Sequence, residues 1–170
     1  MKIFRPTAIL LLLIFQASCD FSPAGSGCRA PFTASSGPFL GSEAPNFTLP
    51  DLSGEPVELA RLFNEKPVLI IFWATWCPTC REEIPVLNEW IKKYPHLQIL
   101  AVNVQEPAER VRAFAEKEGI RYPVVLDQEA EVAVQYGLVG VPASILIARG
   151  GRILYYGFAL PRHVDRLIQE

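Results

Sequence analysis

A run of six apolar residues, Val68–Trp73, constrains the fold of this chain more than any other feature of its sequence. Because the run is rich in β-branched and aromatic side chains, it is typical of a strand buried on both faces. Shortly after it, residues 80–94 place Ile84, Leu87 and Ile91 at three- and four-residue steps, which is the spacing of a helix with one apolar face. A buried strand followed by an amphipathic helix predicts an α/β fold.

Strands and helices alternate along the rest of the chain. Residues 46–49 and 57–58 flank a turn at 51–54 and predict a short hairpin, which residues 59–63 follow with one helical turn. Further strands are predicted at 99–104, 124–126, 144–147 and 153–156, and further helices at 108–118, 129–136 and 162–169. A tight turn at 149–151 joins the last two strands, so we expect a central mixed sheet, flanked by helices, that turns antiparallel at one edge.

The N-terminal residues differ in composition from the rest. Lys2 and Arg5 precede an apolar run over 8–15, which predicts a signal peptide at residues 1–18, because a spanning helix needs about 20 apolar residues. The small residues before Cys19 resemble the bacterial lipobox, in which that Cys would carry lipid as the first residue of a mature lipoprotein. The residues that follow are dense in Ser, Gly, Pro and Ala, which is typical of a flexible tether. We therefore expect a tether at 19–40 and one folded domain at 41–170.

The charge balance excludes one class of partner. Lys and Arg total 16 and Asp and Glu total 18, and no segment gathers the basic residues into a stripe. A nucleic-acid-binding protein needs such a stripe to neutralise phosphates. We therefore expect no nucleic acid partner.

The motif Trp76-Cys77-Pro78-Thr79-Cys80 lies between the buried strand and the helix, and this position indicates redox chemistry. A Cys at a helix N-terminus has a lowered pKa, because unpaired backbone N–H groups and the helix dipole stabilise its thiolate. Cys77 is therefore the predicted attacking thiol. Cys80, one turn along, is the predicted resolving thiol, which displaces a mixed disulfide formed on Cys77. Pro78 suits the first helical turn, where its missing N–H costs nothing.

Three other uses of the two cysteines compete with this interpretation. A structural zinc site would need four ligands, and no other Cys or His lies at metal-binding spacing, so we expect no metal. A structural disulfide across so short a loop would remove little entropy from the unfolded chain. Copper is the better rival, because thiolates select Cu(I) and His163 could approach from the C-terminal region. Cys28 lies in the predicted tether and is assigned no function.

The segment FWATWCPTC at 72–80 resembles the thioredoxin active-site segment. Other segments resemble the bacterial TlpA and ResA branch of membrane-tethered thioredoxins, which includes the cytochrome c maturation reductases. They are the domain opening at 41–47, the active-site helix at 80–85, the extra strand at 122–127 and the loop at 136–142. The resemblance covers residues 41–157, and it implies a thioredoxin-like fold with an inserted helix and strand.

The resemblance also implies roles for individual residues. Pro142 would be a cis-proline that faces the cysteines, and the backbone of Val141 would pair with an extended substrate. Glu83 would take the proton from the resolving thiol, because a carboxylate partly shielded from water has a raised pKa. It would replace the buried Asp that ordinary thioredoxins carry at the position of Ile71. The surface on which the substrate docks would include Trp76, Pro78 and Thr79.

Together these features predict an extracytoplasmic, membrane-tethered and monomeric thiol-disulfide oxidoreductase that reduces disulfides in exported proteins, apocytochrome c being the leading substrate. A membrane thiol-electron transporter would supply the electrons, and no cofactor beyond the pair Cys77 and Cys80 is expected. A copper metallochaperone or copper-binding module stays open as an alternative. So does a protein disulfide oxidase, because reduction potentials on this fold range from about −270 to −120 mV. A peroxiredoxin is disfavoured, because position 73 is Trp where the peroxiredoxin pattern requires Pro.

Overall fold

A computed structural model describes residues 40–169. The predicted signal peptide, almost all of the predicted tether, Cys19 and Cys28 lie outside these residues, so those predictions stay predictions. The helices are α1 (Leu59–Glu65), α2 (Pro78–Lys93), α3 (Ala108–Glu118), α4 (Glu131–Gln135) and α5 (Val164–Leu167). The strands are β1 (Thr48–Pro50), β2 (Pro56–Glu58), β3 (Val68–Trp73), β4 (Gln98–Val104), β5 (Val124–Asp127), β6 (Ala143–Ile147) and β7 (Ile153–Gly157).

Five of these strands form one sheet with the order β5-β4-β3-β6-β7. The pairs β3–β4 and β4–β5 are parallel, whereas β3–β6 and β6–β7 are antiparallel. The strands β1 and β2 form a separate antiparallel hairpin. The predicted fold class is confirmed: a mixed central sheet turns antiparallel at one edge, and α3 with β5 supplies the inserted helix and strand.

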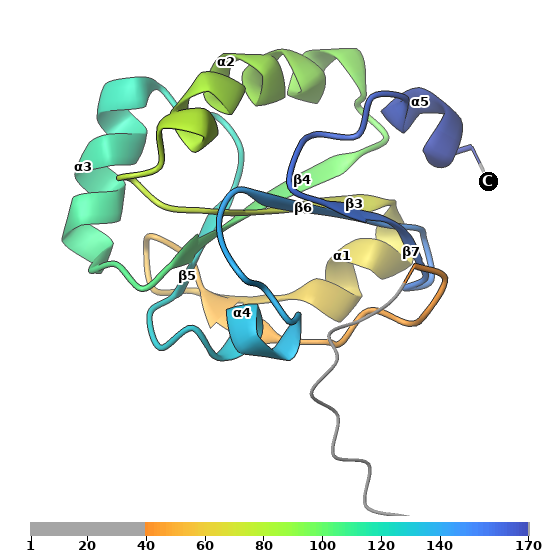
Figure 1. Ribbon diagram of the computed structural model, residues 1–170, viewed down its shortest axis with the longest axis horizontal. Coiled ribbons are helices and arrows are strands. Elements are labelled where there is room, and N and C mark those ends of the chain that lie inside the picture. Colours follow the sequence, from red (N-terminus) through yellow and green to blue (C-terminus); the bar gives the residue numbers. More distant parts are fainter. Residues whose placement is uncertain (1–39, 170) are drawn as a thin grey trace, which may run out of the picture. The chain divides into compact units, whose positions relative to one another are not determined.

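The central strand β3 is buried on both faces, as its apolar run predicts. Val68, Ile70 and Phe72 point into a core shared with α1 and α4. The alternate residues of β3, Leu69 and Ile71 among them, point into a second core shared with α2, α3 and α5. Figure 1 shows the same layers, with α2, α3 and α5 over one face of the sheet and α1, α4 and the β1–β2 hairpin over the other. The sheet therefore holds the start of α2 firmly beside the end of β3.

Four helices differ in extent from the sequence prediction, among them α1, which continues to Glu65. Helix α4 begins at Glu131, because Ala130 adopts a left-handed conformation with φ 58° and cannot belong to the helix. Helix α5 covers only Val164–Leu167, and α2 begins at Pro78, directly after the first cysteine. Within residues 40–169, no helix has both the length and the apolar content required to span a membrane.

Candidate active site

Cys77 and Cys80 form a disulfide at the junction of β3 and α2, with their Cα atoms 5.3 Å apart. Cys77 is the N-cap of α2, and its Sγ accepts a hydrogen bond from the backbone N–H of Cys80 at 3.1 Å. Pro78 occupies the first helical turn, as expected from its missing donor, and Thr79 beside it is exposed. Each cysteine exposes only 4% of its surface. The disulfide is thus shielded from solvent. The sulfur of Cys77 lies at the helix N-terminus, where negative charge is stabilised.

Glu83 lies one turn beyond Cys80 on α2 and is half-buried rather than exposed. Burial raises the pKa of its carboxyl, and a backbone hydrogen bond from Leu160 partly opposes that rise. The Oε2 atom is buried and has no hydrogen-bond partner among the described residues. Burial, and then the nearby charge of Glu83, also raises the pKa of Tyr122 well above its usual range. Glu83 therefore has the shielded setting that its implied role requires, whereas the role itself is untested.

The bond between Val141 and Pro142 is cis, as the resemblance implies. Phe72 pairs with Ala143, the first residue of β6, so Pro142 directly precedes β6 at the level where β3 ends and the active-site turn begins. Val141 and Trp76 line one groove beside this turn. The structure thus brings Trp76, Val141 and Pro142 to the same end of the sheet as the cysteines.

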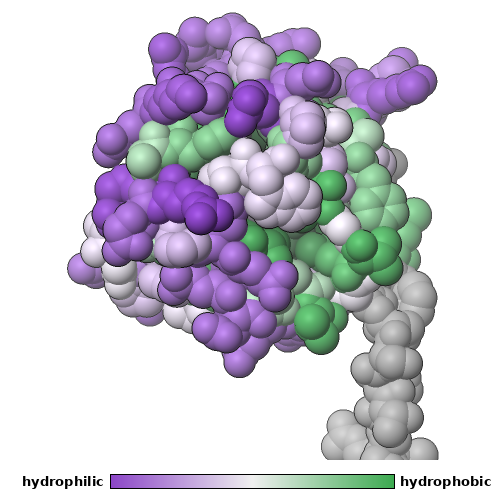
Figure 2. All heavy atoms as spheres, turned by 60° about the vertical axis from the view of Figure 1, so that its left-hand side comes forward, coloured by the Kyte–Doolittle hydropathy of each residue, from purple (hydrophilic) through white to green (hydrophobic). Residues whose placement is uncertain are grey.

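This groove is lined mainly by apolar residues. Its other lining residues are Ala74, Val104, Gln105, Ala130, Ala133, Val134, Leu138, Val139 and Gly140. Three of its large side chains are strongly exposed: Trp76 by 68%, Val134 by 76% and Val139 by 86%. Figure 2 shows the face of the molecule on which β3 ends. Apolar side chains gather at one side of this face, and the rest of the face is mostly hydrophilic. Such a concentration of exposed apolar surface is typical of a binding site.

Trp73, in contrast, belongs to the core. Only 4% of its surface is exposed, and its ring packs on Phe114 with the centroids 5.6 Å apart. Of the two tryptophans that flank the turn, only Trp76 is available to a partner. Trp73 instead fixes the end of β3 against α3.

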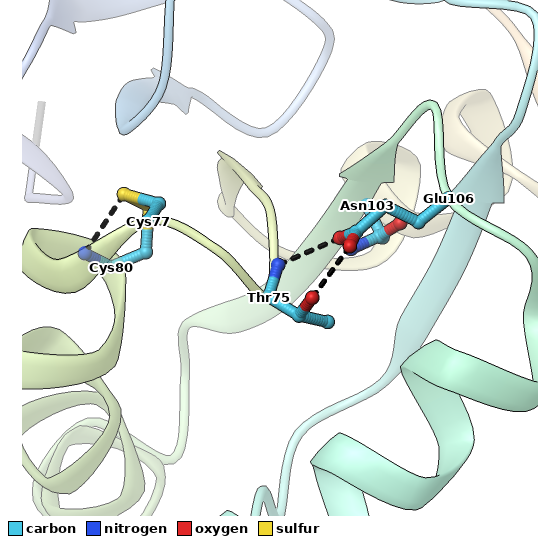
Figure 3. Close-up of a disulfide and its surroundings, with 5 residues drawn as sticks. All are labelled: Thr75, Cys77, Cys80, Asn103 and Glu106. Atoms are coloured by element: carbon cyan, nitrogen blue, oxygen red, sulfur yellow. Dashed lines mark hydrogen bonds between the residues drawn. A yellow bond between two sulfur atoms is a disulfide. The ribbon is translucent and has the colours of Figure 1, made fainter.

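A polar cluster beside the cysteines was missed by the sequence interpretation. Glu106, 3% exposed, accepts hydrogen bonds from the backbone N–H of Thr75 at 2.7 Å, the Thr75 hydroxyl at 2.5 Å and Asn103 Nδ2 at 2.8 Å (Figure 3). The available signal was positional. Asn103 lies near the end of β4 and Glu106 shortly after it, and adjacent parallel strands such as β3 and β4 end at the same edge of a sheet.

The copper alternative gains no third ligand from the structure. Within residues 40–169, no three His, Cys, Asp or Glu side chains gather so that they could hold a metal ion. His163 is exposed and forms the N-cap of α5.

The fold and this site define a class of protein. A five-stranded mixed sheet, a disulfide at the strand-to-helix junction and a cis-proline beside it make this chain a thioredoxin-like thiol-disulfide oxidoreductase. The chain belongs to the AhpC/TSA family, whose pattern matches residues 40–156.

Individual relatives agree with this class. The chain is 35% identical to the thiol-disulfide oxidoreductase ResA of Bacillus thuringiensis subsp. konkukian, over 86% of this chain and 83% of that protein. It is 39% identical to ResA of Geobacillus thermodenitrificans, over 89% and 84% of the two chains. Among solved structures, a putative thiol:disulfide interchange protein DsbE from Chlorobium tepidum superposes with a TM-score of 0.69 at 28% identity, over 76% of this chain and 94% of that one. All three relatives are named for thiol-disulfide chemistry.

Proposed function

We propose that the protein reduces disulfides in exported proteins outside the cytoplasm, with apocytochrome c as the leading substrate. The observation that carries this proposal is the paired sulfurs of Cys77 and Cys80 at the N-terminus of α2, beside an apolar groove and a cis-proline. The reducing direction and the substrate rest on the resemblance to the TlpA and ResA branch. The names of the ResA relatives support the exchange chemistry.

The reaction begins with the reduced protein. The Cys77 thiolate attacks one sulfur of the substrate disulfide, so a bond forms between the two sulfurs while the substrate S–S bond breaks. The substrate's other sulfur leaves as a thiolate and takes a proton from water. Cys80 then loses its proton and attacks Cys77 Sγ, which releases the second substrate sulfur. Two electrons have passed to the substrate, and the protein is left with the disulfide seen in Figure 3.

Glu83 is the proposed acceptor of the Cys80 proton. It lies one helical turn from Cys80, where residues three apart are neighbours. Because burial raises the pKa of Glu83, its carboxylate is a stronger base than an exposed one and holds a proton more readily near neutral pH. The proton then passes to solvent while Cys80 remains bonded to Cys77.

The substrate is proposed to bind as an extended segment along the groove. Because Cys77 is nearly closed off, a partner sulfur must be brought to it by a chain that fits closely around the turn. The exposed indole of Trp76 and the backbone of Val141 line the groove, and Pro78, Thr79 and Pro142 complete the proposed docking surface around the cysteines. The apolar lining favours substrate segments with apolar side chains near their cysteines.

The proposed setting is the outer side of the cytoplasmic membrane. A membrane thiol-electron transporter would return Cys77 and Cys80 to the dithiol form, and no further cofactor would be needed. The predicted signal peptide, with lipid on Cys19, would tether a monomeric domain to that surface. These elements rest on the sequence and the resemblance.

The reduction potential of the full chain in glutathione buffers tests this proposal. We expect a two-electron couple near the reducing end of the range, about −270 mV, that is lost in both Cys77→Ser and Cys80→Ser. With a disulfide-bonded apocytochrome c, Cys80→Ser should accumulate a mixed disulfide on Cys77, and Cys77→Ser should not. A couple near −120 mV would indicate a disulfide oxidase instead. No reversible couple, together with stoichiometric Cu(I), would indicate a copper carrier.

A further inference from the structure

Glu106 is a buried carboxylate that the proposed reaction does not use. It lies in the loop between β4 and α3, and 3% of its surface is exposed. In the described part of the chain, its side chain makes no hydrogen bond to either cysteine. A buried carboxylate is costly unless its oxygens are satisfied, so its partners show what it holds in place.

Its close partners are Thr75 and Asn103. Oε2 accepts the backbone N–H of Thr75 and Asn103 Nδ2, and Oε1 accepts the Thr75 hydroxyl. Arg110 is more distant, with Nη1 3.9 Å from Oε1, and its side chain is 64% exposed, so this ion pair contributes little. The Glu106 carboxylate therefore binds both the backbone and the side chain of Thr75. Hydrogen bonds to a charged acceptor are the strong ones.

Thr75 is a central residue of the turn that presents the nucleophile. The turn runs from Ala74 to Cys77 and is closed by a hydrogen bond from Cys77 N–H to the Ala74 carbonyl at 3.2 Å. Its second central residue is Trp76, whose indole lines the groove. Figure 3 shows Thr75 reaching from the active-site loop toward Glu106 and Asn103, while Cys77 continues to the helix on the other side.

The loop that carries Glu106 is fixed by a backbone hydrogen bond to β5. Gln105 adopts a left-handed conformation with φ 59°, and its N–H donates to the Asp127 carbonyl at 3.0 Å. Gln105 also lines the groove. The loop thus connects the sheet, the groove wall and the active-site turn.

We propose that Glu106 is a positioning residue for Cys77: it holds the turn 74–77 so that the Cys77 sulfur lies at the N-terminus of α2. This inference rests on the proposed function, in which Cys77 is the attacking thiol. A looser turn would move the sulfur away from the Cys80 N–H that it accepts at 3.1 Å. The thiolate would then be less stabilised and less well aimed, and misplacement by about 1 Å can cost about 10²-fold in rate.

The test compares four single variants of the full chain and the double variant that combines Glu106→Gln with Thr75→Val. Glu106→Gln keeps the shape of the side chain but replaces the carboxylate, and Thr75→Val removes the hydroxyl donor while leaving Glu106 unchanged. Thr75→Ser restores the hydroxyl, and Glu109→Gln removes an exposed carboxylate nearby on α3 as a matched control. The readouts are the rate at which the reduced Cys77 is alkylated, followed by mass spectrometry on its peptide, and the equilibrium with glutathione.

We expect Glu106→Gln and Thr75→Val each to slow Cys77 alkylation by about tenfold or more and to shift the glutathione equilibrium. The double variant should be no slower than the slower single variant, because both changes break the same contact. Thr75→Ser and Glu109→Gln should behave like the parent. If Glu106→Gln does not fold, Thr75→Val carries the test, since it leaves the buried carboxylate with its other two donors.

Two outcomes would overturn the proposal. Lower unfolding temperatures with an unchanged alkylation rate and glutathione equilibrium would show that Glu106 only stabilises the fold. Faster alkylation in Glu106→Gln, with no effect of Thr75→Val, would show that its charge acts directly on the thiolate. Failure of the proposed function is a separate result, because it would be seen in the parent protein as a Cys77 that reacts no faster than Cys80.

Discussion

Glu83 follows Cys80 by one turn of α2, and its Oε2 is buried without a hydrogen-bond partner among the described residues. Burial raises the pKa of this carboxyl. It is therefore protonated, and unable to accept a proton from Cys80, at pH values where an exposed Glu is already ionised. The rate at which Cys80 resolves a mixed disulfide on Cys77 should fall as the pH drops through the raised pKa of Glu83.

Glu83→Gln should remove this acidic limb and slow the resolution step by about 10²-fold, which is the lower end of the range for general base catalysis. The measurement is the release of glutathione from a preformed Cys77 mixed disulfide across a pH series. Glu82→Gln, an exposed carboxylate one position earlier, is the matched control. An unchanged pH profile in Glu83→Gln would remove Glu83 from the mechanism.

The Glu83 carboxyl should lower the free energy of unfolding at neutral pH. Because the pKa of Glu83 is raised in the folded protein, the folded state binds more protons than the unfolded state between the ordinary and the raised pKa. The free energy of unfolding therefore falls as the pH rises through that window, and the loss is complete above the raised pKa. Glu83→Gln, which cannot ionise, should be more stable than the parent at about pH 7.

The greater stability of Glu83→Gln should disappear below the ordinary pKa of Glu, where the Glu83 side chain and the Gln that replaces it are both neutral. Urea unfolding of the oxidised proteins at the two pH values measures it, with Glu82→Gln again as the control. Equal stabilities of Glu83→Gln and the parent at neutral pH would contradict the raised pKa. A stabilising substitution that slows turnover would show that the site has been kept for function.

The sequence predicts those features that depend on neighbouring residues. The strand Val68–Trp73 follows from its apolar run, and the redox pair follows from the position of its motif between strand and helix. The half-burial of Glu83 is implied by the family resemblance and could not be predicted from local sequence, which favours an exposed carboxylate on the helix; nor could the backbone hydrogen bond from Leu160, which comes from far along the chain.

The contact between Glu106 and Thr75 depends on register. It exists because Trp73 pairs with Asn103 across β3 and β4, and that pairing brings the two strand ends together. The predicted start of α4 at residue 129 is too early, because Ala130 adopts a left-handed conformation and the side chain of Asp127 caps the helix. Both oxygens of the buried Asp127 accept backbone N–H groups, from Val132 at 3.2 Å and Ala133 at 2.8 Å, and so cap the helix from outside it. No local pattern specifies such a cap.

A negative charge in the groove should weaken the reduction of protein substrates. Val139 lines the groove and is 86% exposed, so Val139→Asp places a carboxylate on the proposed docking surface with little effect on folding. We expect slower reduction of a protein disulfide and an unchanged rate with a small disulfide such as oxidised glutathione, which needs no groove.

Val86→Asp is the matched control, because Val86 is also exposed, by 42%, and is not among the residues that line the groove. It should leave both rates unchanged. Equal slowing by the two variants, or slowing with both kinds of substrate, would argue against docking in the groove.

Tyr136 ties the opening of the domain to its core. The side chain is fully buried, its ring packs against Phe47 and Phe72, and its hydroxyl donates to the Pro45 carbonyl at 2.7 Å. Tyr136→Phe keeps the ring contacts and leaves that carbonyl without its donor, so it should lower the free energy of unfolding by about 1–2 kcal/mol. Urea unfolding with an unchanged m-value measures this loss.

Tyr155→Phe is the control, because it removes a more exposed hydroxyl, bonded to the Ala159 carbonyl. It should lower the free energy of unfolding by no more than about 0.5 kcal/mol. If both variants lose the same stability, the Pro45 contact is not what anchors the segment.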